Sequence, residues 1–196
     1  MVFTETPVKG AYVIDLKPHT DNRGFFARVF CVRELAINGL KMSIVQTNLS
    51  FNRKKGTLRG LHYSVPPAAE AKLVRCIKGG IHDVIVDIRR DSPTFLRQFT
   101  IELTAKNRKA LYVPEMVAHG FQTLADDVEV YYQMGEFYIS EVQRGIRYDD
   151  PELNITWPLA VSEISEKDLQ LPFLAEYLEE AARAREFHPS FLHDHS

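Results

Sequence analysis

The sequence predicts an all-β protein, a sandwich or barrel built mostly from antiparallel strands. Stretches rich in β-branched and aromatic residues recur at intervals of about ten residues, and turn-forming residues separate them. Helix-length amphipathic segments do not fall between these stretches, which argues against alternating strands and helices. In chain order, the expected strands are residues 11–16, 25–32, 42–50, 58–63, 73–77, 81–88, 95–103, 111–113 and 129–138.

One turn within this series is well defined by its residues. Lys78-Gly79-Gly80 lies between two apolar stretches. Glycine reaches positive φ angles without steric cost, as tight hairpin turns require. We therefore expect a hairpin here that sets the register of its two flanking strands.

A helical pattern follows the last strands. Leu174, Tyr177, Leu178 and Ala181 are spaced so that they share one face of a helix, with charged residues opposite. This predicts a short C-terminal helix that packs on the barrel.

Length and composition fit one compact domain. The chain has 196 residues, of which 45% are hydrophobic and 26% are charged, so it can bury a full core within the size of a single domain. We expect residues 1–187 to form this domain and residues 188–196 to form a disordered tail.

Charge and cysteine content exclude several classes of protein. A net charge of −2 gives no overall attraction to nucleic acid or to anionic membranes. An apolar run of about 18 residues, as a membrane span needs, is absent, and the N-terminus lacks a signal-peptide pattern. Cys31 and Cys76 are too few for a disulfide scaffold. These features predict a cytoplasmic protein that binds neither nucleic acid nor membrane.

Three polar clusters interrupt the apolar pattern, at residues 57–63, 114–121 and 165–168. Each places a titratable group beside glycine or apolar residues. Ligand sites of small barrels lie in the mouth and interior. One histidine on a strand would be explained by a structural role. Two of them, His62 and His119, together with nearby Lys, Arg and Tyr residues, favour a functional site.

A series of short motifs runs in order along the chain: Asp21-Asn22-Arg23-Gly24-Phe25-Phe26, Gln46-Thr47-Asn48-Leu49-Ser50, Leu58-Arg59-Gly60-Leu61-His62-Tyr63, Lys72-Leu73-Val74, Asp83-Val84-Ile85-Val86-Asp87, His119-Gly120-Phe121, Ile155-Thr156-Trp157-Pro158 and Ser165-Glu166-Lys167-Asp168. From about residue 10 to residue 172, this series resembles the dTDP-4-dehydrorhamnose 3,5-epimerase family. The resemblance implies a cupin-type antiparallel jelly-roll barrel. It also implies epimerisation at C3, C5 or both of a nucleotide-diphosphate-linked 4-keto-6-deoxyhexose.

The resemblance implies catalytic roles that fit this chemistry. His62 would remove a proton from the carbon beside the ketone, and Asp168 would bind its second ring nitrogen and fix the tautomer. Lys72 would stabilise the enolate oxygen. Tyr132 would return a proton from the opposite face, rather than Tyr131, because neighbouring side chains on a strand point to opposite faces. The scheme uses no metal and no other cofactor, since the ketone itself acidifies C3 and C5.

The same resemblance implies a set of substrate-binding residues. Arginine forks suit the diphosphate, and a flat aromatic ring suits stacking on the nucleotide. Arg23 and Arg59 match the diphosphate positions, Tyr138 matches the stacking aromatic, and Gln46 and Asn48 match contacts to the base or ribose. The full set is Arg23, Phe26, Arg28, Gln46, Asn48, Arg59, His119, Tyr138 and Lys167.

Two departures from the family pattern bear on the substrate. Arg28 stands where the family usually has glutamate, and Ser64 stands where it usually has glutamine. A carboxylate could accept the N3 proton of thymine, whereas an arginine only donates. The sequence therefore leaves dTDP, CDP and GDP open as carriers, and it leaves open whether C3, C5 or both are inverted.

Two rival functions follow from the same fold, since a fold alone does not define function. A metal-dependent cupin needs two histidines one residue apart plus a carboxylate, whereas Tyr63 and Ser64 follow His62. A non-catalytic jelly-roll domain that binds a sugar nucleotide would tolerate the loss of Tyr132 or Lys72, yet both are present. Both features favour the epimerase.

The resemblance finally implies a homodimer. In such a dimer the N-terminal segment reaches into the neighbouring site, so that Arg23 would serve the partner subunit, and the two-fold pairing would cover exposed sheet edges.

Overall fold

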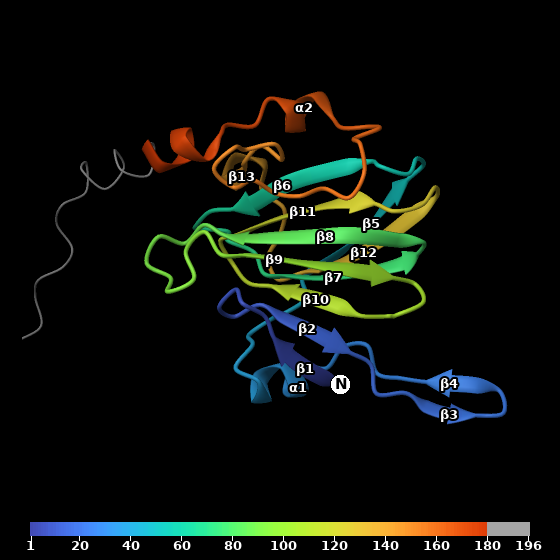
Figure 1. The fold of residues 1–196 in the computed structure, drawn as a ribbon. Coiled ribbons are helices and arrows are strands. Elements are labelled where there is room, and N and C mark those ends of the chain that lie inside the picture. The colour runs from blue at the N-terminus through green and yellow to red at the C-terminus, as the bar shows by residue number, and fades with distance from the viewer. Residues whose placement is uncertain (180–196) are drawn as a thin grey trace, which may run out of the picture.

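The computed structural model describes residues 1–179 and confirms an all-β fold (Figure 1). Two sheets lie face to face, and short helices lie outside them. The elements are β1 (Val2–Glu5), β2 (Tyr12–Asp15), β3 (His19–Asp21), β4 (Gly24–Phe26), α1 (Val32–Ile37), β5 (Gln46–Asn52), β6 (Leu58–Ser64), β7 (Lys72–Lys78), β8 (Gly80–Asp87), β9 (Gln98–Thr104), β10 (Ala110–Val113), β11 (Val117–Thr123), β12 (Val128–Met134), the 3₁₀ helix η1 (Ser140–Val142), β13 (Gln143–Gly145) and α2 (Glu166–Leu169).

The chain alternates between the two layers. One sheet has six strands in the order β1-β2-β10-β7-β12-β5, and the other has five in the order β13-β6-β11-β8-β9. The strand pairs within both sheets are antiparallel. From β5 to β8, each strand enters the sheet opposite to that of the strand before it. Residues far apart in the sequence therefore face one another across the space between the sheets.

Apolar side chains fill most of that space. Val74 and Val130 of the six-stranded sheet belong to the same buried cluster as Ile85 and Phe121 of the five-stranded sheet. Because side chains alternate along a strand, every second residue points inward, and burial of these residues stabilises the fold.

The outer face of each sheet is partly covered by a terminal segment. The segment that holds Leu35 and Leu40 packs on the six-stranded sheet, and residues after β13, including Leu153 and Leu174, pack on the five-stranded sheet. Residues 174–179 are helical, which confirms the start of the predicted C-terminal helix. Its predicted residue Ala181, the predicted domain boundary at residue 187 and the predicted tail at 188–196 lie outside the described residues.

The prediction that Lys78-Gly79-Gly80 closes a hairpin is wrong, because the strands β7 and β8 on either side of it do not pair with each other. Gly79 has the expected positive φ of 75°. However, β7 is bonded on both sides, by β10 and β12, and β8 pairs with β11 and β9. With both edges of β7 occupied, the turn cannot return β8 alongside it and instead carries the chain into the other sheet.

The predicted strand at residues 25–32 is also wrong over most of its length. Strand β4 ends at Phe26, and α1 begins at Val32. The apolar residues of this region serve another purpose, because Phe30 and Leu35 pack on the outside of the six-stranded sheet. An apolar stretch that covers a sheet resembles a strand when only composition is read.

Strand β11 was not among the predicted strands. It lies between β6 and β8, and all of its residues are buried. Its polar residues His119 and Gln122 mask the apolar pattern of a central strand. The strands β1, β3 and β13 were likewise not predicted, whereas the remaining predicted strands are confirmed with shifted ends.

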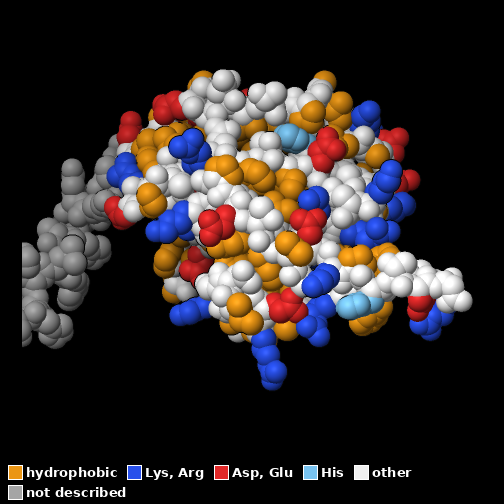
Figure 2. Space-filling view, turned by 60° about the horizontal axis from the view of Figure 1, so that its bottom comes forward, with side chains coloured by type: hydrophobic (Ala, Val, Ile, Leu, Met, Phe, Trp, Pro, Cys, Tyr) orange, Lys and Arg blue, Asp and Glu red, His pale blue; other side chains and the backbone are white. Residues whose placement is uncertain are grey.

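The hairpin formed by β3 and β4 stands clear of the two sheets (Figure 1). The space-filling view shows the same arm projecting from the body (Figure 2). All six of its strand residues are exposed, including Phe26 with 77% of its surface accessible. Within residues 1–179, no helix is long and apolar enough to cross a membrane.

Candidate active site

A cavity of about 400 Å³ lies between the sheets, with walls from both. A smaller chamber of about 240 Å³ adjoins it, because His62, Lys72 and Tyr138 line both. The main cavity is lined by Asn48, Ser50, Arg59, His62, Lys72, His119, Gly120, Phe121, Tyr132, Met134 and Tyr138. The chamber adds Gln143, Arg144, Lys167 and Leu171.

His62 and Asp168 form a hydrogen-bonded pair at the cavity wall. The Nε2 atom of His62 lies 2.7 Å from Oδ1 of Asp168, and the Gly60 N–H donates to Oδ2 at 3.2 Å. Burial alone would raise the pKa of Asp168, but the hydrogen bonds from His62, Gly60 and Ser165 lower it below its usual value. The carboxylate therefore stays charged and orients the imidazole, which leaves Nδ1 of His62 to act on a substrate.

The position of Asp168 follows from a local cap. Ser165 precedes α2 and accepts a hydrogen bond from the Asp168 N–H at 3.1 Å, as an N-cap serine does. The segment before α2 is fixed to β6, since the Leu58 N–H donates to the Glu163 carbonyl at 2.9 Å. These contacts hold Asp168 beneath His62.

An irregularity in β6 turns both Arg59 and His62 toward the cavity. These residues are three positions apart and would normally point to opposite faces. On β11, their partners Phe121 and His119 are only two positions apart, so β6 contains an extra residue. Gly60 occupies the irregularity with a φ of 104°, and a Cβ there would lie 2.6 Å from the His119 carbonyl. Only glycine fits this close approach.

Tyr132 reaches the cavity from the opposite sheet. It lies on β12, whereas His62 lies on β6, and Tyr131 does not line the cavity. Burial raises the pKa of Tyr132 far above its usual value, and the nearby Asp83 raises it further. The hydroxyl therefore stays protonated near neutral pH and is available as a proton donor.

Lys72 is held by a carboxylate that the sequence analysis missed. Its Nζ lies 3.1 Å from Oε1 of Glu70, and the two side chains are only 9% and 3% exposed. The Glu70 N–H in turn donates to Oγ of Ser64 at 2.9 Å. The sequence could have indicated this pair, because Glu70 and Lys72 are two positions apart and residues i and i+2 of an extended chain share a face.

His119 also has a buried carboxylate beside it. Its Nε2 lies 2.9 Å from Oδ1 of Asp83, which is fully buried on β8. Neither atom has a well-directed hydrogen bond among the described residues, so the contact is one of proximity and charge. The His119 ring meets the Tyr132 ring edge-on, with centroids 6.3 Å apart. Asp83 was part of a recognised motif, but no feature of the sequence indicated its partner.

The structure brings most of the predicted binding residues to the cavity. Asn48, Arg59, His119 and Tyr138 line it, and Lys167 lines the adjoining chamber. Gln46 does not line either one. Its Oε1 accepts a hydrogen bond from the Tyr138 N–H at 2.9 Å, so it positions that residue.

Three predicted binding residues lie elsewhere in this chain. Arg23 and Phe26 are on the projecting hairpin, where Arg23 pairs with Asp21 at 2.6 Å and its side chain is 86% exposed. Arg28 pairs with Glu34 at 2.7 Å. Within one subunit these three residues do not meet the cavity.

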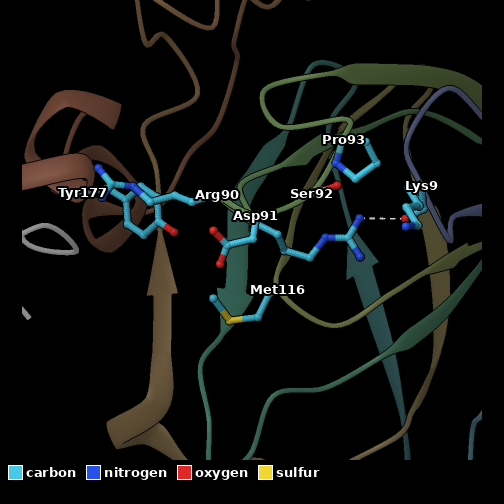
Figure 3. A pocket seen from close by; sticks show the side chains of 8 residues that line it. Lys9, Arg90, Asp91, Ser92, Pro93, Met116 and Tyr177 are labelled. Carbon is cyan, nitrogen blue, oxygen red and sulfur yellow. Dashed lines mark hydrogen bonds between the residues drawn. The ribbon is translucent and has the colours of Figure 1, made fainter. Parts of the chain in front are cut away.

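Another cavity, of about 460 Å³, lies outside the two sheets (Figure 3). Its two arginines are already engaged. Arg89 contacts Asp87 and the Lys9 carbonyl, and Arg90 donates to the Leu178 carbonyl. None of the predicted catalytic residues lines it. We therefore assign the chemistry to the cavity between the sheets.

Groups of three or more His, Cys, Asp or Glu residues that could hold a metal ion are absent from residues 1–179. Cys31 and Cys76 are both free thiols.

Comparison with known proteins decides the family. The family model for dTDP-4-dehydrorhamnose 3,5-epimerase matches residues 5–176. The chain belongs to this family. A dTDP-4-dehydrorhamnose 3,5-epimerase from Shigella flexneri is 42% identical over 167 residues, which cover 84% of this chain and 91% of that protein.

Two solved epimerases have the same architecture. The enzyme from Bacillus anthracis, with TDP and PPi bound, has a TM-score of 0.85 and 39% identity, with 88% of this chain and 99% of that one covered. The enzyme from Legionella pneumophila, in complex with dTDP-4-keto-L-rhamnose, has a TM-score of 0.82 and 34% identity, with 89% and 93% covered. The chain is thus a carbohydrate epimerase with a cupin-type jelly-roll fold, as the sequence predicted.

Proposed function

We propose that this epimerase inverts C3 and C5 of a dTDP-linked 4-keto-6-deoxyglucose. The observation that supports this most directly is the placement of His62 and Tyr132 on opposite walls of one cavity. Inversion of a carbon requires that a proton leave one face and another arrive at the opposite face. Two groups on facing sheets meet that requirement.

Each inversion then proceeds in two proton transfers. Nδ1 of His62 takes the proton from the carbon beside the ketone. The electron pair of the C–H bond forms a double bond to C4, and the π pair of the carbonyl moves to the C4 oxygen, which gives an enolate. The Lys72 ammonium donates to that oxygen and lowers the barrier. The enolate then collapses to the ketone as Tyr132 delivers its phenolic proton to the opposite face. His62 loses its proton to solvent and Tyr132 regains one, which restores the enzyme.

The nucleotide would lie toward Arg59, Asn48 and Tyr138 of the cavity lining. The guanidinium of Arg59 is held by Asn52, whose Oδ1 accepts from Nε at 2.7 Å. A fixed guanidinium suits a diphosphate, and the exposed ring of Tyr138 suits a base. The related structures with TDP and dTDP-4-keto-L-rhamnose bound support dTDP as the carrier.

We further propose that the enzyme works as a homodimer. The outer face of the six-stranded sheet exposes Leu49, Phe51 and Ile77, and apolar surface of this kind favours association. The projecting hairpin would place Arg23 and Phe26 at the partner's cavity, which accounts for their distance from the cavity of their own chain. A cytoplasmic location stays a prediction from the sequence.

Deuterium exchange tests the proposed reaction. The purified enzyme is incubated in D2O with 4-keto-6-deoxyglucose carried on dTDP, CDP or GDP, and the C3 and C5 protons are followed by NMR. We expect loss of both signals on dTDP, and no loss with His62→Ala. Exchange at one carbon only would revise the enzyme to a mono-epimerase. Exchange on CDP or GDP but not on dTDP would overturn the carrier.

A further inference from the structure

A buried carboxylate stands behind one of the proposed catalytic residues. The Nζ atom of Lys72 lies 3.1 Å from Oε1 of Glu70, and the two side chains are only 9% and 3% exposed. Lys72 lines both the main cavity and the adjoining chamber, whereas Glu70 lines neither. A buried ion pair is weak evidence for a role in stability, because the cost of desolvating two charges offsets their attraction. The pair therefore calls for an explanation in the site itself.

Backbone contacts fix the segment that carries both side chains. The Glu70 N–H donates to Oγ of Ser64 at 2.9 Å, and the Gly135 N–H donates to the Ala71 carbonyl at 2.8 Å. Ser64, which stands where the family usually has glutamine, is buried and lines neither the cavity nor the chamber. Its hydroxyl is used to anchor Glu70, so the departure at this position bears on Glu70 and Lys72.

The proposed reaction requires an accurately placed ammonium group. Lys72 is proposed to donate to the C4 oxygen as the enolate forms, and such a donor is most effective when it is fixed before the reaction. A lysine side chain has a flexible four-carbon stem and three N–H donors. A carboxylate that accepts from one of these donors fixes the direction of the stem and leaves two donors for the substrate.

We propose that Glu70 is a positioning residue, which holds the Lys72 ammonium where it donates to the C4 oxygen of the hexose. Glu70 acts only through Lys72, because it lies outside the cavity and the chamber. Its contribution depends on an acceptor oxygen within reach of Nζ. The proposal rests on the proposed epimerase function and adds a residue to it.

A double-mutant cycle of Glu70 and Lys72 tests the proposal. The rate constant kcat is measured by NMR in D2O, from the loss of the C3 and C5 protons of dTDP-linked 4-keto-6-deoxyglucose at saturation. We expect Glu70→Ala to lower kcat about 10-fold or more, because a small displacement of a catalytic group has a large effect on rate. Lys72→Met should lower it about 100-fold or more, as for loss of an oxyanion donor. In the Lys72→Met background, Glu70→Ala should cause no further loss.

Two further variants separate position from charge. Glu70→Gln keeps the length of the side chain and an acceptor oxygen, so its kcat should stay within about fivefold of the wild type. Glu70→Asp keeps the charge but shortens the reach, so its kcat should be lower than that of Glu70→Gln. This comparison holds even if Glu70→Ala does not fold. A kcat for Glu70→Asp above that of Glu70→Gln would overturn the positioning role.

Binding and a matched control exclude a merely structural effect. The dissociation constant of dTDP, which lacks the hexose, is measured by calorimetry and should be the same for Glu70→Ala and the wild type. Asp15→Ala is the matched control, because Asp15 pairs with Lys109 at 2.9 Å and lines neither the cavity nor the chamber. It should leave kcat unchanged.

The outcomes separate the two proposals. If the wild type exchanges its substrate and Glu70→Ala lowers kcat equally with and without Lys72, the role of Glu70 is overturned while the epimerase function stands. The same holds if Glu70→Ala leaves kcat unchanged, or if it weakens dTDP binding as much as it lowers kcat. If the wild type exchanges neither proton, the proposed substrate fails, and the role of Glu70 fails with it.

Discussion

His62, the proposed base, and Asp168, the carboxylate bonded to it, are 106 positions apart in the chain, and their Nε2 and Oδ1 atoms lie 2.7 Å apart. Asp168 reaches His62 because Ser165 caps α2 and because the segment before α2 is bonded to β6. The low pKa of Asp168 means that its charge persists at any pH where the enzyme would work. At this scale, the proposed function depends on one carboxylate that fixes one imidazole.

Asp168→Asn tests that dependence. The amide keeps the shape of the side chain but removes the charge that orients and supports His62. We expect kcat to fall by at least about 100-fold, as for loss of effective general-base catalysis, with little change in dTDP affinity. Asp149→Asn, at an exposed ion pair with Arg147, is the matched control and should retain activity. Activity of Asp168→Asn within twofold of the wild type would contradict the assignment.

His82 predicts a pH dependence of stability. Its ring lies edge-on against Trp157, and burial lowers its pKa below the usual 6.5, although Asp83 and Glu102 oppose the shift. A histidine with a lowered folded-state pKa binds its proton more readily when the chain is unfolded. Its contribution to stability is therefore present above about pH 6.5 and is lost as the pH falls below that value.

Urea unfolding at pH 7.5 and pH 5.5 measures this effect. We expect the free energy of unfolding of the wild type to fall between these pH values, and we expect His82→Phe to lose less over the same range. An equal loss in both proteins would show that His82 is not a source of the acid sensitivity.

The candidate catalytic residues could be proposed from the sequence because each lies in a short motif with a chemical purpose. Their partners could not. Glu70 and Asp83 were not recognised as partners, because the pairings depend on strand register and on which face each residue occupies. Phe26 and Arg28 show the converse limit, since the sequence grouped them with the binding residues but did not reveal that they lie away from the cavity of their own chain.

At the level of elements, the decisive feature is the irregularity in β6. It brings Arg59 and His62 to one face, so that the proposed diphosphate contact and the base share the cavity. A regular strand would have directed one of them to the other side of the sheet. The Gly60 conformation is therefore as important to the site as the charged residues.

Gly60→Ala tests the irregularity. Gly60 has positive φ, and an added Cβ would meet the His119 carbonyl at 2.6 Å and Cα of Gly120 at 2.8 Å. We expect a loss of about 3 kcal/mol or more in the free energy of unfolding, measured in urea. Gly39→Ala is the control, because Gly39 also has positive φ but open space around it, and it should cost only about 1 kcal/mol. Equal costs at both positions would contradict the close approach.

Strands with a regular pattern of apolar residues were predicted well. How the chain connects one strand to the next was not. The apolar stretches of β7 and β8 and the positive φ of Gly79 were predicted, yet these two strands lie in different sheets. Nothing local distinguishes a turn that closes a hairpin from one that crosses between layers. Strand β11 was obscured because the polar residues His119 and Gln122 lie within a fully buried strand.

At the level of the whole molecule, one subunit presents a cavity and an arm that does not reach it. The proposed second subunit would account for both the exposed hairpin and the apolar outer face. In that arrangement, the proposed site is completed by residues of two chains.

Light scattering during size-exclusion chromatography tests the dimer. Two copies of the 22.5 kDa chain should elute together at micromolar concentration. Placing Asp at both Leu49 and Phe51 should yield monomers with reduced activity, because charge on the outer face opposes association. Ile37→Asp, at an 83% exposed residue on α1, should leave the mass unchanged. A wild type that runs as a monomer would contradict the proposal.

The central claim is that His62 and Tyr132 act from opposite faces of the sugar. It is tested most directly by following deuterium incorporation and epimer formation together, by NMR in D2O, for the wild type, Tyr132→Phe and Tyr131→Phe. We predict that Tyr132→Phe still exchanges substrate protons through His62 but forms the epimer at least about 100-fold more slowly. Tyr131→Phe should behave as the wild type. Epimer formation at the wild-type rate by Tyr132→Phe would contradict the account.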